Sequence, residues 1–303
     1  MTQISQITTS SAPDPGAPLR LGRREYPRER RLVMAIVNRT PDSFYDRGAT
    51  YALEAALDRV DLVVAQGADI LDIGGVKAAP GHEVTLAQEV ERTAPFVAQV
   101  RARYPDLVIS VDTYRHEVAQ QVCQAGADVL NDTWGGADPR LVEVAAEHGA
   151  AIVCAHAGGV TPRTRPHRIG YDDVVADVIA RTTALARRAV AAGVDPSRVL
   201  IDPAHDFGKN TWHSLEVTRR LGELVETGWP VLVSLSNKDF VGEALGAPLE
   251  ERVTGTLAAT AVSAWQGAMV FRAHQVAQTR QVLDMVSVIA GELPPAGTVR
   301  GLA

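Results

Sequence analysis

The chain has 303 residues and a formal net charge of −6, with 46% hydrophobic, 22% charged and 5% aromatic residues. These values are typical of a globular protein in water, long enough for one barrel domain or two smaller ones. The negative charge and the few aromatic residues argue against a nucleic-acid-binding surface. No apolar run is long enough to cross a bilayer and no charged-then-apolar leader is seen, so we expect no membrane partner.

The two cysteines, Cys123 and Cys154, lie in Ala- and Val-rich surroundings, and neither belongs to a Cys-x-x-Cys pair. We therefore expect both to be buried free thiols rather than metal ligands. Free thiols suit a reducing compartment, so the sequence favours a cytoplasmic location.

The N-terminal segment is expected to be a flexible tail over residues 1–29, followed by a barrel domain over residues 30–303. It begins with a stretch rich in Thr, Ser and Pro, which offers too little apolar surface to fold. Arginines follow at positions 20, 23, 24, 28, 30 and 31. They could bind an anionic partner, although charge runs of this kind usually form a solvated surface.

Apolar runs of strand length then alternate with stretches of helical spacing. The expected strands are 32–38, 69–73, 107–112, 128–131, 151–155, 199–202, 230–235 and 268–272. The expected helices include 52–66, 85–103, 115–124, 171–192, 250–266 and 275–290. This order predicts parallel strands joined by right-handed crossovers. Eight such units favour a single α/β domain, a (β/α)8 TIM barrel, although periodicity alone does not exclude an open doubly wound sheet.

A polar residue stands at the carboxyl end of every expected strand. These residues are Asn38, Asp72, Asp112, Asn131, His156, Asp202, Ser236 and Arg272. In a barrel the carboxyl ends of the strands meet at one mouth, so these side chains would share a site. Each one alone has a structural explanation, because Asp caps helices and Asn forms turns. Polar residues at the ends of all eight strands favour a shared functional site over eight separate structural roles.

The chemistry of these residues divides into two groups. Asp112, Asn131, Asp202 and Lys238 offer carboxylate and amide acceptors together with amide and ammonium donors. This mixture suits the edge of a flat heterocycle with alternating donors and acceptors, such as an aminopyrimidinone ring. Buried carboxylates need partners, and a ring N–H with an exocyclic amine would supply them.

The second group could hold a diphosphate. Arg272 and His274 are two residues apart on a strand, so they point to the same side. Together with Asn38 they could bind a diphosphate and its magnesium ion. A leaving diphosphate needs positive charge near its developing oxygens, which this group offers.

Seven motifs, in order, resemble dihydropteroate synthase. They are Asn38–Phe44 (Asn-x-Thr-Pro-Asp-Ser-Phe), Asp72–Gly75 (Asp-Ile-Gly-Gly), Val111–Thr113 (Val-Asp-Thr), Asn131–Gly136 (Asn-Asp-x-x-Gly-Gly), Asp202–Lys209 (Asp-Pro-x-x-x-Phe-Gly-Lys), Ser236–Lys238 (Ser-x-Lys) and Arg272–His274 (Arg-x-His). The resemblance extends from about Leu32 to Ala290. It implies a (β/α)8 barrel, usually a homodimer. The implied reaction displaces diphosphate from a hydroxymethyl-dihydropterin diphosphate with the amine of p-aminobenzoate, in the presence of Mg2+, on the route to folate.

The resemblance also implies roles for individual residues. The pterin would be held by Asp112, Asn131, Asp202 and Lys238. The diphosphate would be held by Asn38, Arg272 and His274, with Asn38 also binding the metal. The catalytic residues would be Lys238, Arg272 and His274, and the pocket for the second substrate would include Phe207 and Ser236.

Departures from the family pattern gather around the second substrate. The usual Gly-Gly-Glu-Ser-Thr-Arg-Pro-Gly loop reads Gly74–Gly81 here, with Ala78 and Ala79 in place of Thr and Arg. Losing a charge-assisted contact to a diphosphate costs roughly 1.5–3 kcal/mol. Lys77 precedes Ala78, but alternation along an extended loop would turn it toward solvent.

Other departures also lie near the expected pocket of the second substrate. The usual Ser-Arg-Lys has Asn237 in the middle, and the usual glycine before it is Ser234. The usual Asp-Pro-Gly-Phe-Gly-Phe becomes Asp202–Phe207, which puts Asp206 near a site for two anions. Met-His-Met becomes Ala155–Ala157, which widens one wall. The loop 158–168 is basic and could attract an anion, although an exposed loop with scattered charge explains it as well.

Four interpretations of the function follow. The chain could be a working dihydropteroate synthase, a divergent second copy that binds a pterin-like anion with the condensation impaired or lost, a pterin-dependent methyl-transfer barrel, or a non-catalytic partner subunit. The Pro-Asp-Ser-Phe loop and the Arg-x-His pair favour the synthase branch, and polar strand ends in every unit argue against a pure scaffold. Ala78, Ala79, Asp206 and Asn237 favour the divergent copy.

Overall fold

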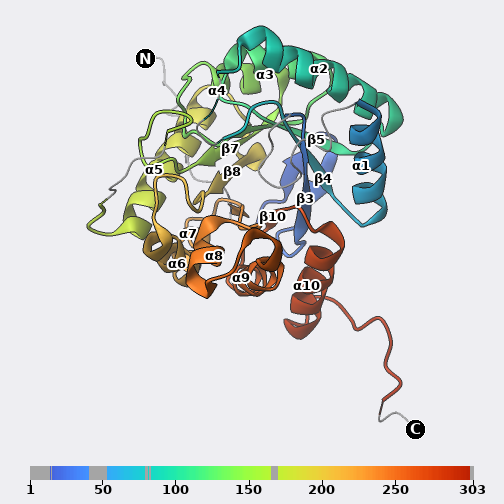
Figure 1. Cartoon of the computed structure of the whole chain (residues 1–303), viewed down its shortest axis with the longest axis vertical. Helices are drawn as coiled ribbons and strands as arrows, with labels where there is room; N and C mark the ends of the chain where they lie inside the picture. Colours follow the sequence, from blue (N-terminus) through green and yellow to red (C-terminus); the bar gives the residue numbers. More distant parts are fainter. Residues whose placement is uncertain are drawn as a thin grey trace, which may run out of the picture.

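A computed structural model gives the structure of residues 14, 16–40, 53–78, 81, 83–164 and 170–300. Eight strands form one sheet in the order β8-β7-β6-β5-β4-β3-β10-β9, and each neighbouring pair is parallel. A parallel bridge between Ile201 and Val231 brings the two edges together, so the sheet curls into a nearly closed barrel. Helices surround it (Figure 1). The predicted (β/α)8 barrel is confirmed, and the open-sheet alternative is wrong.

The strands of the barrel agree closely with the expected runs. They are β3 (Leu32–Asn38), β4 (Ile70–Gly74), β5 (Val108–Asp112), β6 (Val129–Asp132), β7 (Ala151–Ala155), β8 (Val199–Asp202), β9 (Leu232–Val233) and β10 (Val270–Ala273). In the register of the sheet, Asn38 lies beside Gly74, Gly74 beside Asp112, and Asp112 beside Asn131. Because the strands are parallel, this register brings their carboxyl ends to one mouth.

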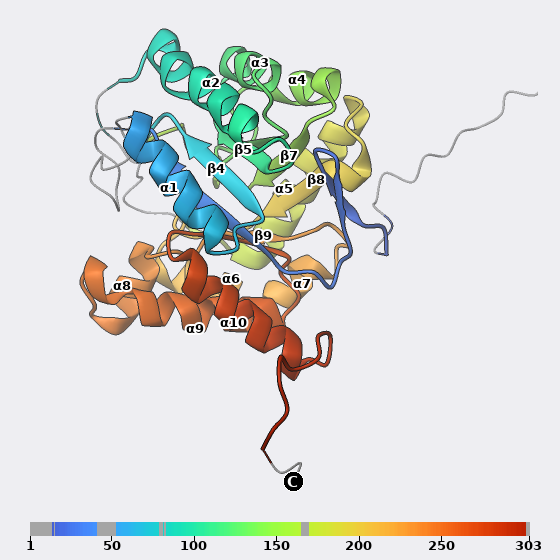
Figure 2. The ribbon, with the colours of Figure 1, turned by 90° about the vertical axis from the view of Figure 1, so that its right-hand side faces the viewer.

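The helices form an outer layer around the strands (Figures 1 and 2). They are α1 (Leu53–Ala65), α2 (Leu86–Arg103), α3 (His116–Gln124), α4 (Leu141–His148), α5 (Val174–Ala191), α6 (Thr211–Arg219), α7 (Leu221–Val225), α8 (Asp239–Leu245), α9 (Val253–Trp265) and α10 (Val276–Ile289), with short 3-10 helices at Pro196–Arg198 and Leu249–Glu251. The sequence pattern does not single out α4, α6, α7 or α8, because they are short and carry little of the helical repeat. None of the described helices is long and apolar enough to cross a membrane.

Side-chain caps set where two of the long helices begin. The hydroxyl of Thr85 accepts a hydrogen bond from the N–H of Gln88, and the Gln88 side chain accepts one from the N–H of Thr85, which starts α2. Asp173 accepts from two backbone N–H groups at the start of α5. Gly75 lets α2 approach β4 closely, since a Cβ there would lie 2.6 Å from Cγ2 of Thr93.

Apolar residues form two layers of core. The larger layer lies between the strands and the surrounding helices and includes Val33, Leu71 and Phe96. The smaller layer fills the barrel near the amino ends of the strands and includes Leu32 and Met34. The barrel is therefore solid below its mouth, and only the carboxyl end is left for a ligand.

An N-terminal hairpin closes the other end of the barrel. Strands β1 (Leu19–Leu21) and β2 (Arg24–Tyr26) pair antiparallel, and Leu19 and Leu21 are fully buried in the smaller core layer. The predicted tail over residues 1–29 is therefore corrected for the hairpin, and the folded part of the chain begins before residue 30. Composition missed it because the apolar face consists of a few residues among arginines, Leu19, Leu21 and Tyr26. Residues 1–13 lie outside the described residues.

Candidate active site at the barrel mouth

A cavity of about 410 Å³ opens at the carboxyl ends of the strands. The predicted site residues that line it are Asn38, Asp112, Asp202, Phe207, Ser236, Lys238, Arg272 and His274. They come from five strands or the segments that follow them, so the fold brings together residues that lie far apart in the sequence. Asn131 is not part of the lining and lies buried behind it. Residues 41–44, the end of the first motif, lie outside the described residues.

A network of buried charges forms the inner end of the cavity. Nε of Arg272 lies 2.6 Å from Oδ2 of Asp72, and its Nη2 lies 3.5 Å from Oδ2 of Asp112. Asp72 is fully buried and also accepts a hydrogen bond of 2.6 Å from Oγ of Ser110. Although burial disfavours the charge of Arg272, Asp72 and Asp112 hold its pKa above the usual value. Arg272 is thus fixed in the wall before any ligand arrives.

Asp72 is a site residue to which sequence reasoning assigned no role. It stands inside the apolar run Ile70–Ile73, where a carboxylate is costly to bury without a counter-charge. That position was the available signal, but nothing in the sequence shows that the partner is Arg272, two hundred residues further along the chain.

Three acceptors stand at the inner end of the cavity or directly behind it. Burial raises the pKa of Asp112 to about 7 against the opposing effect of Arg272, and Thr133 donates to its Oδ1 at 3.1 Å. Burial also raises the pKa of Asp202, whose Oδ1 accepts from the N–H of Ala204 at 2.6 Å. The amide nitrogen of Asn131 lies 3.4 Å from both carboxylate oxygens of Asp72. Its Oδ1 is buried and has no hydrogen-bond partner in the described structure.

Lys238 and two aromatic rings form the next part of the wall. The ammonium of Lys238 donates to the carbonyl of His205 and lies 4.8 Å from the centroid of the Phe207 ring. Burial lowers the pKa of Lys238, while Asp206 and Asp202 oppose this effect. The rings of Phe207 and Trp134 meet edge to face at 5.1 Å.

His274 is held as a neutral ring beside Ser236. Its Nδ1 lies 2.9 Å from Oγ of Ser236, and the same Oγ accepts from the backbone N–H of His274 at 3.1 Å. Burial and the charge of Arg272 lower the pKa of His274 to about 3. The positive charge of this pair therefore comes from Arg272, and His274 offers hydrogen bonds only.

His156 and Lys209 contact each other at the edge of the cavity, which Lys209 lines. Lys209 donates to the carbonyls of His156, Ala204 and Phe207 and to Nδ1 of His156, at 2.7–3.2 Å. The other ring nitrogen of His156 lies 2.7 Å from Oδ1 of Asp177. Burial and the charge of Lys209 lower the pKa of His156 to about 4, so the neutral ring accepts from Lys209 and donates to Asp177. His156, the end of one expected strand, therefore does not line the cavity.

The substituted residues differ in where they lie. Ala78 and Ser234 line the cavity, and so does Lys77, which the sequence pattern turned toward solvent. Asn237 is fully buried outside the lining, where its N–H donates to Thr256 and its side chain to Gln275. It adopts the left-handed φ of 56° that Asn tolerates. Ala79 lies outside the described residues, as does most of the basic end of the 158–168 loop.

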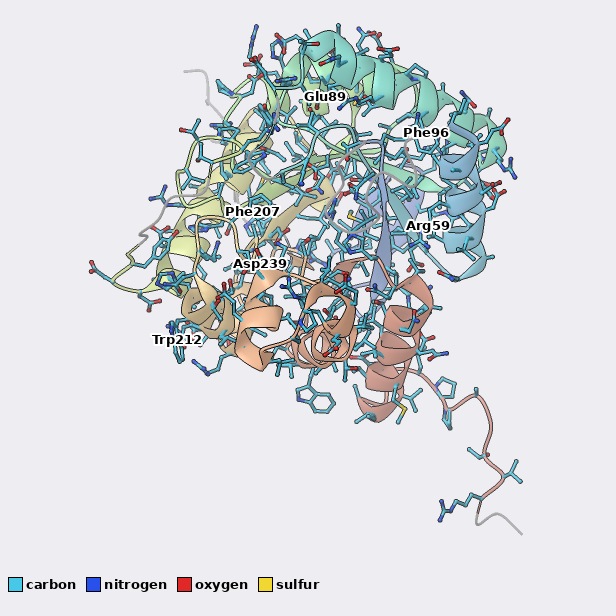
Figure 3. All side chains as sticks on the ribbon, viewed as in Figure 1. Arg59, Glu89, Phe96, Phe207, Trp212 and Asp239 are labelled. Atoms are coloured by element: carbon cyan, nitrogen blue, oxygen red, sulfur yellow. The ribbon has the colours of Figure 1, made fainter. Side chains whose placement is uncertain are left out.

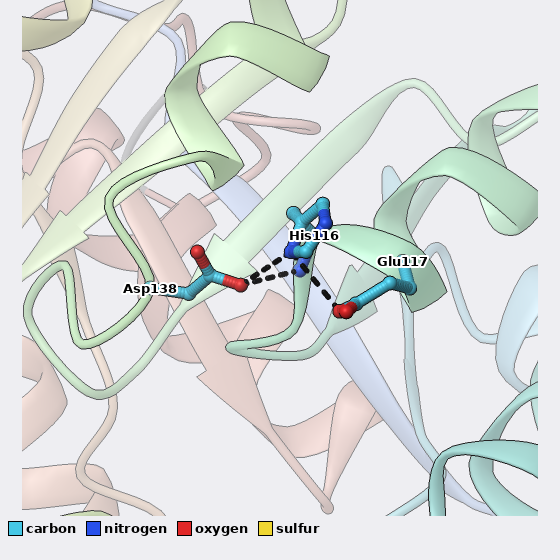
Figure 4. Close-up of side chains that lie close together, drawn as sticks. All are labelled: His116, Glu117 and Asp138. Atoms are coloured by element: carbon cyan, nitrogen blue, oxygen red, sulfur yellow. Dashed lines mark hydrogen bonds and ion pairs between the residues drawn. The ribbon is translucent and has the colours of Figure 1, made fainter.

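Among the described residues, one group outside the cavity has side chains close enough for a metal ion. It consists of His116, Glu117 and Asp138 at the start of α3 (Figure 4). Nδ1 of His116 lies 2.7 Å from Asp138 and 3.0 Å from Glu117, and the N–H of His116 also donates to Asp138. These contacts already satisfy the group as an ordinary cap of α3. Among the described residues of the mouth no such carboxylate–histidine group occurs.

Comparison with known proteins gives the ancestry of this site. Residues 34–274 match the family model described as pterin binding enzyme. The chain belongs to the pterin-binding enzyme family. It is 60% identical over 279 residues to the protein named inactive dihydropteroate synthase 2 of Mycobacterium leprae, which covers 91% of this chain and 96% of that protein.

Solved structures from the same family share the fold. The Yersinia pestis dihydropteroate synthase in a sulfonamide complex has a TM-score of 0.86 and 33% identity, covering 91% of this chain and 100% of that one. The Xanthomonas albilineans dihydropteroate synthase with 4-aminobenzoic acid has a TM-score of 0.82 and 36% identity, covering 92% and 100%. The resemblance to dihydropteroate synthase in its divergent form is thereby confirmed.

Proposed function

We propose that the chain binds a pterin diphosphate at the inner end of the cavity and that the condensation with p-aminobenzoate is impaired or lost. The observation that carries the proposal is the pair of carboxyl groups that line the inner end, Asp112 and Asp202, whose pKa values burial raises. A buried acceptor of this kind is costly unless a ligand supplies a donor.

The pterin ring supplies those donors. Its ring N–H and exocyclic amine would donate to Asp112, Asp202 and the Asn131 carbonyl oxygen, while Lys238 would donate to an acceptor on the ring. Ring donors favour the ionised form of a carboxylate and so oppose the effect of burial on Asp112 and Asp202. The site is thus incomplete without a ligand that carries donors on one edge and acceptors on another.

The diphosphate would lie against Arg272, His274 and Asn38. Arg272 supplies the charge, and neutral His274 and Ser236 supply hydrogen bonds. Mg2+ fits here only together with the ligand, because Asn38 offers one protein oxygen and Mg2+ commonly takes one or two protein groups plus phosphate oxygens. Gly74 leaves room beside it, since a Cβ there would lie 3.1 Å from Oδ1 of Asn38. A bound Mg2+ would neutralise charge on the diphosphate.

Two observations support the loss of the condensation step. Ala78 lines the cavity without a hydrogen-bonding side chain, and Asp206 adds a carboxylate to the wall. The relative from Mycobacterium leprae is itself named inactive. The alternative of a working synthase draws on the retained Lys238 and Phe207, which keep their places in the cavity.

A complementation assay decides between these two. Cells that lack their own dihydropteroate synthase should not grow without folate end products when they produce this chain, while an active synthase should restore growth. The purified protein, mixed with hydroxymethyl-dihydropterin diphosphate, p-aminobenzoate and Mg2+, should form little dihydropteroate. Robust growth or rapid product formation would establish the working-synthase alternative.

We also propose that the chain forms a homodimer through α9 and α10. The two helices pack against each other and expose an apolar surface made of Val262, Trp265, Met285 and Ile289. Trp265 alone is 62% exposed, and exposed large apolar side chains on packed helices are typical of an interface. Trp265→Glu should convert the dimer into a monomer in analytical ultracentrifugation. An unchanged sedimentation coefficient would place the contact elsewhere.

A cytoplasmic location fits this proposal. Cys154 is buried and Cys123 partly buried, and both are free thiols in the structure. Burial raises the pKa of Cys123 to about 12 and also raises that of Cys154, so both stay protonated and unreactive.

A further inference from the structure

Three carboxylates line the outer end of the cavity. Asp206 contacts the first turn of α8. Asp239 is the first residue of α8, and Glu243 lies one turn further along the same helix. Phe207 and Trp134 supply aromatic rings to the same cavity, and Figure 3 marks Phe207 and Asp239. The wall that begins at α8 is therefore both aromatic and negatively charged.

The cations nearest to these carboxylates are already engaged. Lys209 is surrounded by three backbone carbonyls, and Lys238 donates to the carbonyl of His205. Arg252 lies 2.9 Å from Asp239 and also donates to the carbonyl of Asn237. Lys77 also lines the cavity and lies beside Asp112 and Trp134. A ligand carboxylate near α8 would find Lys209, Lys238 and Arg252 already engaged.

Contacts from two other segments hold Asp206 in this wall. Its Oδ2 accepts from the N–H of Phe240 in α8 at 3.2 Å, and its Oδ1 accepts from Oγ of Ser214 at 3.0 Å. The carboxylate is therefore fixed in the lining of the cavity.

The loop that carries Asp206 has a left-handed backbone at two residues. Asp206 has φ of 67° and Ala204 has φ of 49°. Glycine adopts this left-handed region without steric cost, whereas a residue with a side chain is strained there. The family pattern has glycine at both positions. The loop has kept the glycine conformation while gaining a side chain that enters the cavity lining.

We propose that Asp206 determines the specificity of the outer end, which rejects an anionic second ligand and accepts an uncharged aromatic amine. The inference rests on the proposed function, since it concerns the ligand that lies beside a bound pterin. A benzoate-type ligand carries a full negative charge at neutral pH and would face Asp206, Asp239 and Glu243. An uncharged ring keeps the contacts with Phe207 and Trp134 and avoids this repulsion.

Calorimetric titrations with two matched ligands test the proposal. The full-length protein, with 6-hydroxymethylpterin, inorganic diphosphate and Mg2+ present, is titrated with p-aminobenzoate and with p-aminobenzamide. These probes differ in one group only, and the inner ligand lacks a bond that could react. The wild type should bind the amide about tenfold more tightly or better, a factor that corresponds to about 1.4 kcal/mol.

Asp206→Asn then removes the charge while keeping the fold. Asn tolerates a left-handed φ and can still accept from the N–H of Phe240. In this variant the benzoate should gain affinity and the difference between the probes should shrink, with the amide changed little. Asp106→Asn, the same change at an exposed turn before β5, should leave the difference as it is in the wild type.

Three results would overturn the proposal: equal affinity of the wild type for both probes, an unchanged difference in Asp206→Asn, or binding of neither probe. Failure of the proposed function looks different. In that case 6-hydroxymethylpterin itself gives no binding signal, while the comparison of the two probes can still be made on the protein alone.

Discussion

The inner and outer ends of the cavity differ in how their charges are held. At the inner end, fully buried Asp72 and largely buried Asp112 both pair with Arg272 across the sheet. At the outer end, Asp206 and Glu243 lie on a partly exposed wall, and each makes a contact with another segment of that wall. Exchanging an inner residue therefore disturbs the barrel, whereas the outer end can change its chemistry while the fold remains. This difference explains how a barrel can retain a ligand site and lose a reaction.

Arg272→Met should have the largest effect on stability. It leaves Asp72 buried without its counter-charge, which costs about 3–5 kcal/mol. The free energy of unfolding, from urea titration followed by circular dichroism, measures this loss. The double variant Arg272→Met with Asp72→Asn should recover much of it, because no uncompensated charge remains. A single variant as stable as the double would contradict the paired network.

Stability should depend on pH through Asp112. Burial raises the pKa of this carboxyl from 3.8 to about 7. Between these two pH values the folded protein therefore keeps a proton that the unfolded chain has released. Its contribution to the free energy of unfolding therefore decreases as pH rises from about 4 to about 7, by at most about 1.4 kcal/mol per pH unit.

Urea titrations of the wild type and Asp112→Asn from pH 5 to pH 8 isolate this contribution. The wild type should lose stability relative to the variant up to about pH 7, and the difference should then level off. A difference that stays constant, or that moves in favour of the wild type with rising pH, would show that Asp112 is ionised throughout.

Asp202→Asn should weaken the binding of a pterin by about 1–3 kcal/mol, because a charged acceptor is replaced by a neutral one. The dissociation constant from calorimetry measures the change, and Asp106→Asn serves as the matched control at an exposed site. Unchanged affinity would mean that the ligand lies elsewhere in the cavity.

Asp206→Gly should have the smallest effect on stability. It removes a cap from α8, which costs about 0.5–2 kcal/mol, and it relieves a left-handed backbone worth about 1–2 kcal/mol. The two effects oppose each other, so the free energy of unfolding should stay within about 1 kcal/mol of the wild type. A loss as large as that of Arg272→Met would remove the distinction between the two ends.

The sequence predicted most of the barrel because long apolar runs and helical repeats report directly on burial. It missed the hairpin, since Leu19 and Leu21 give two apolar positions among arginines. It also missed short α8, although that helix shapes the outer wall. Local pattern cannot show which element a short segment packs against.

The site was predicted less completely than the fold. Strand-end polarity identified several of the residues that line the cavity, because parallel strands place their ends together. It did not give the direction of a side chain: Asn237 turns into the protein, His156 braces the wall, and Lys77 lines the cavity. The capping of α8 by Asp206 depends on a contact between distant segments, which only the structure shows.

The most direct test of the account is a calorimetric titration of the wild-type protein with hydroxymethyl-dihydropterin diphosphate in the presence of Mg2+. The account predicts saturable binding at one site per chain, with the affinity reduced in Asp202→Asn. No binding by the wild-type protein, under conditions in which an active dihydropteroate synthase binds the same ligand, would contradict it.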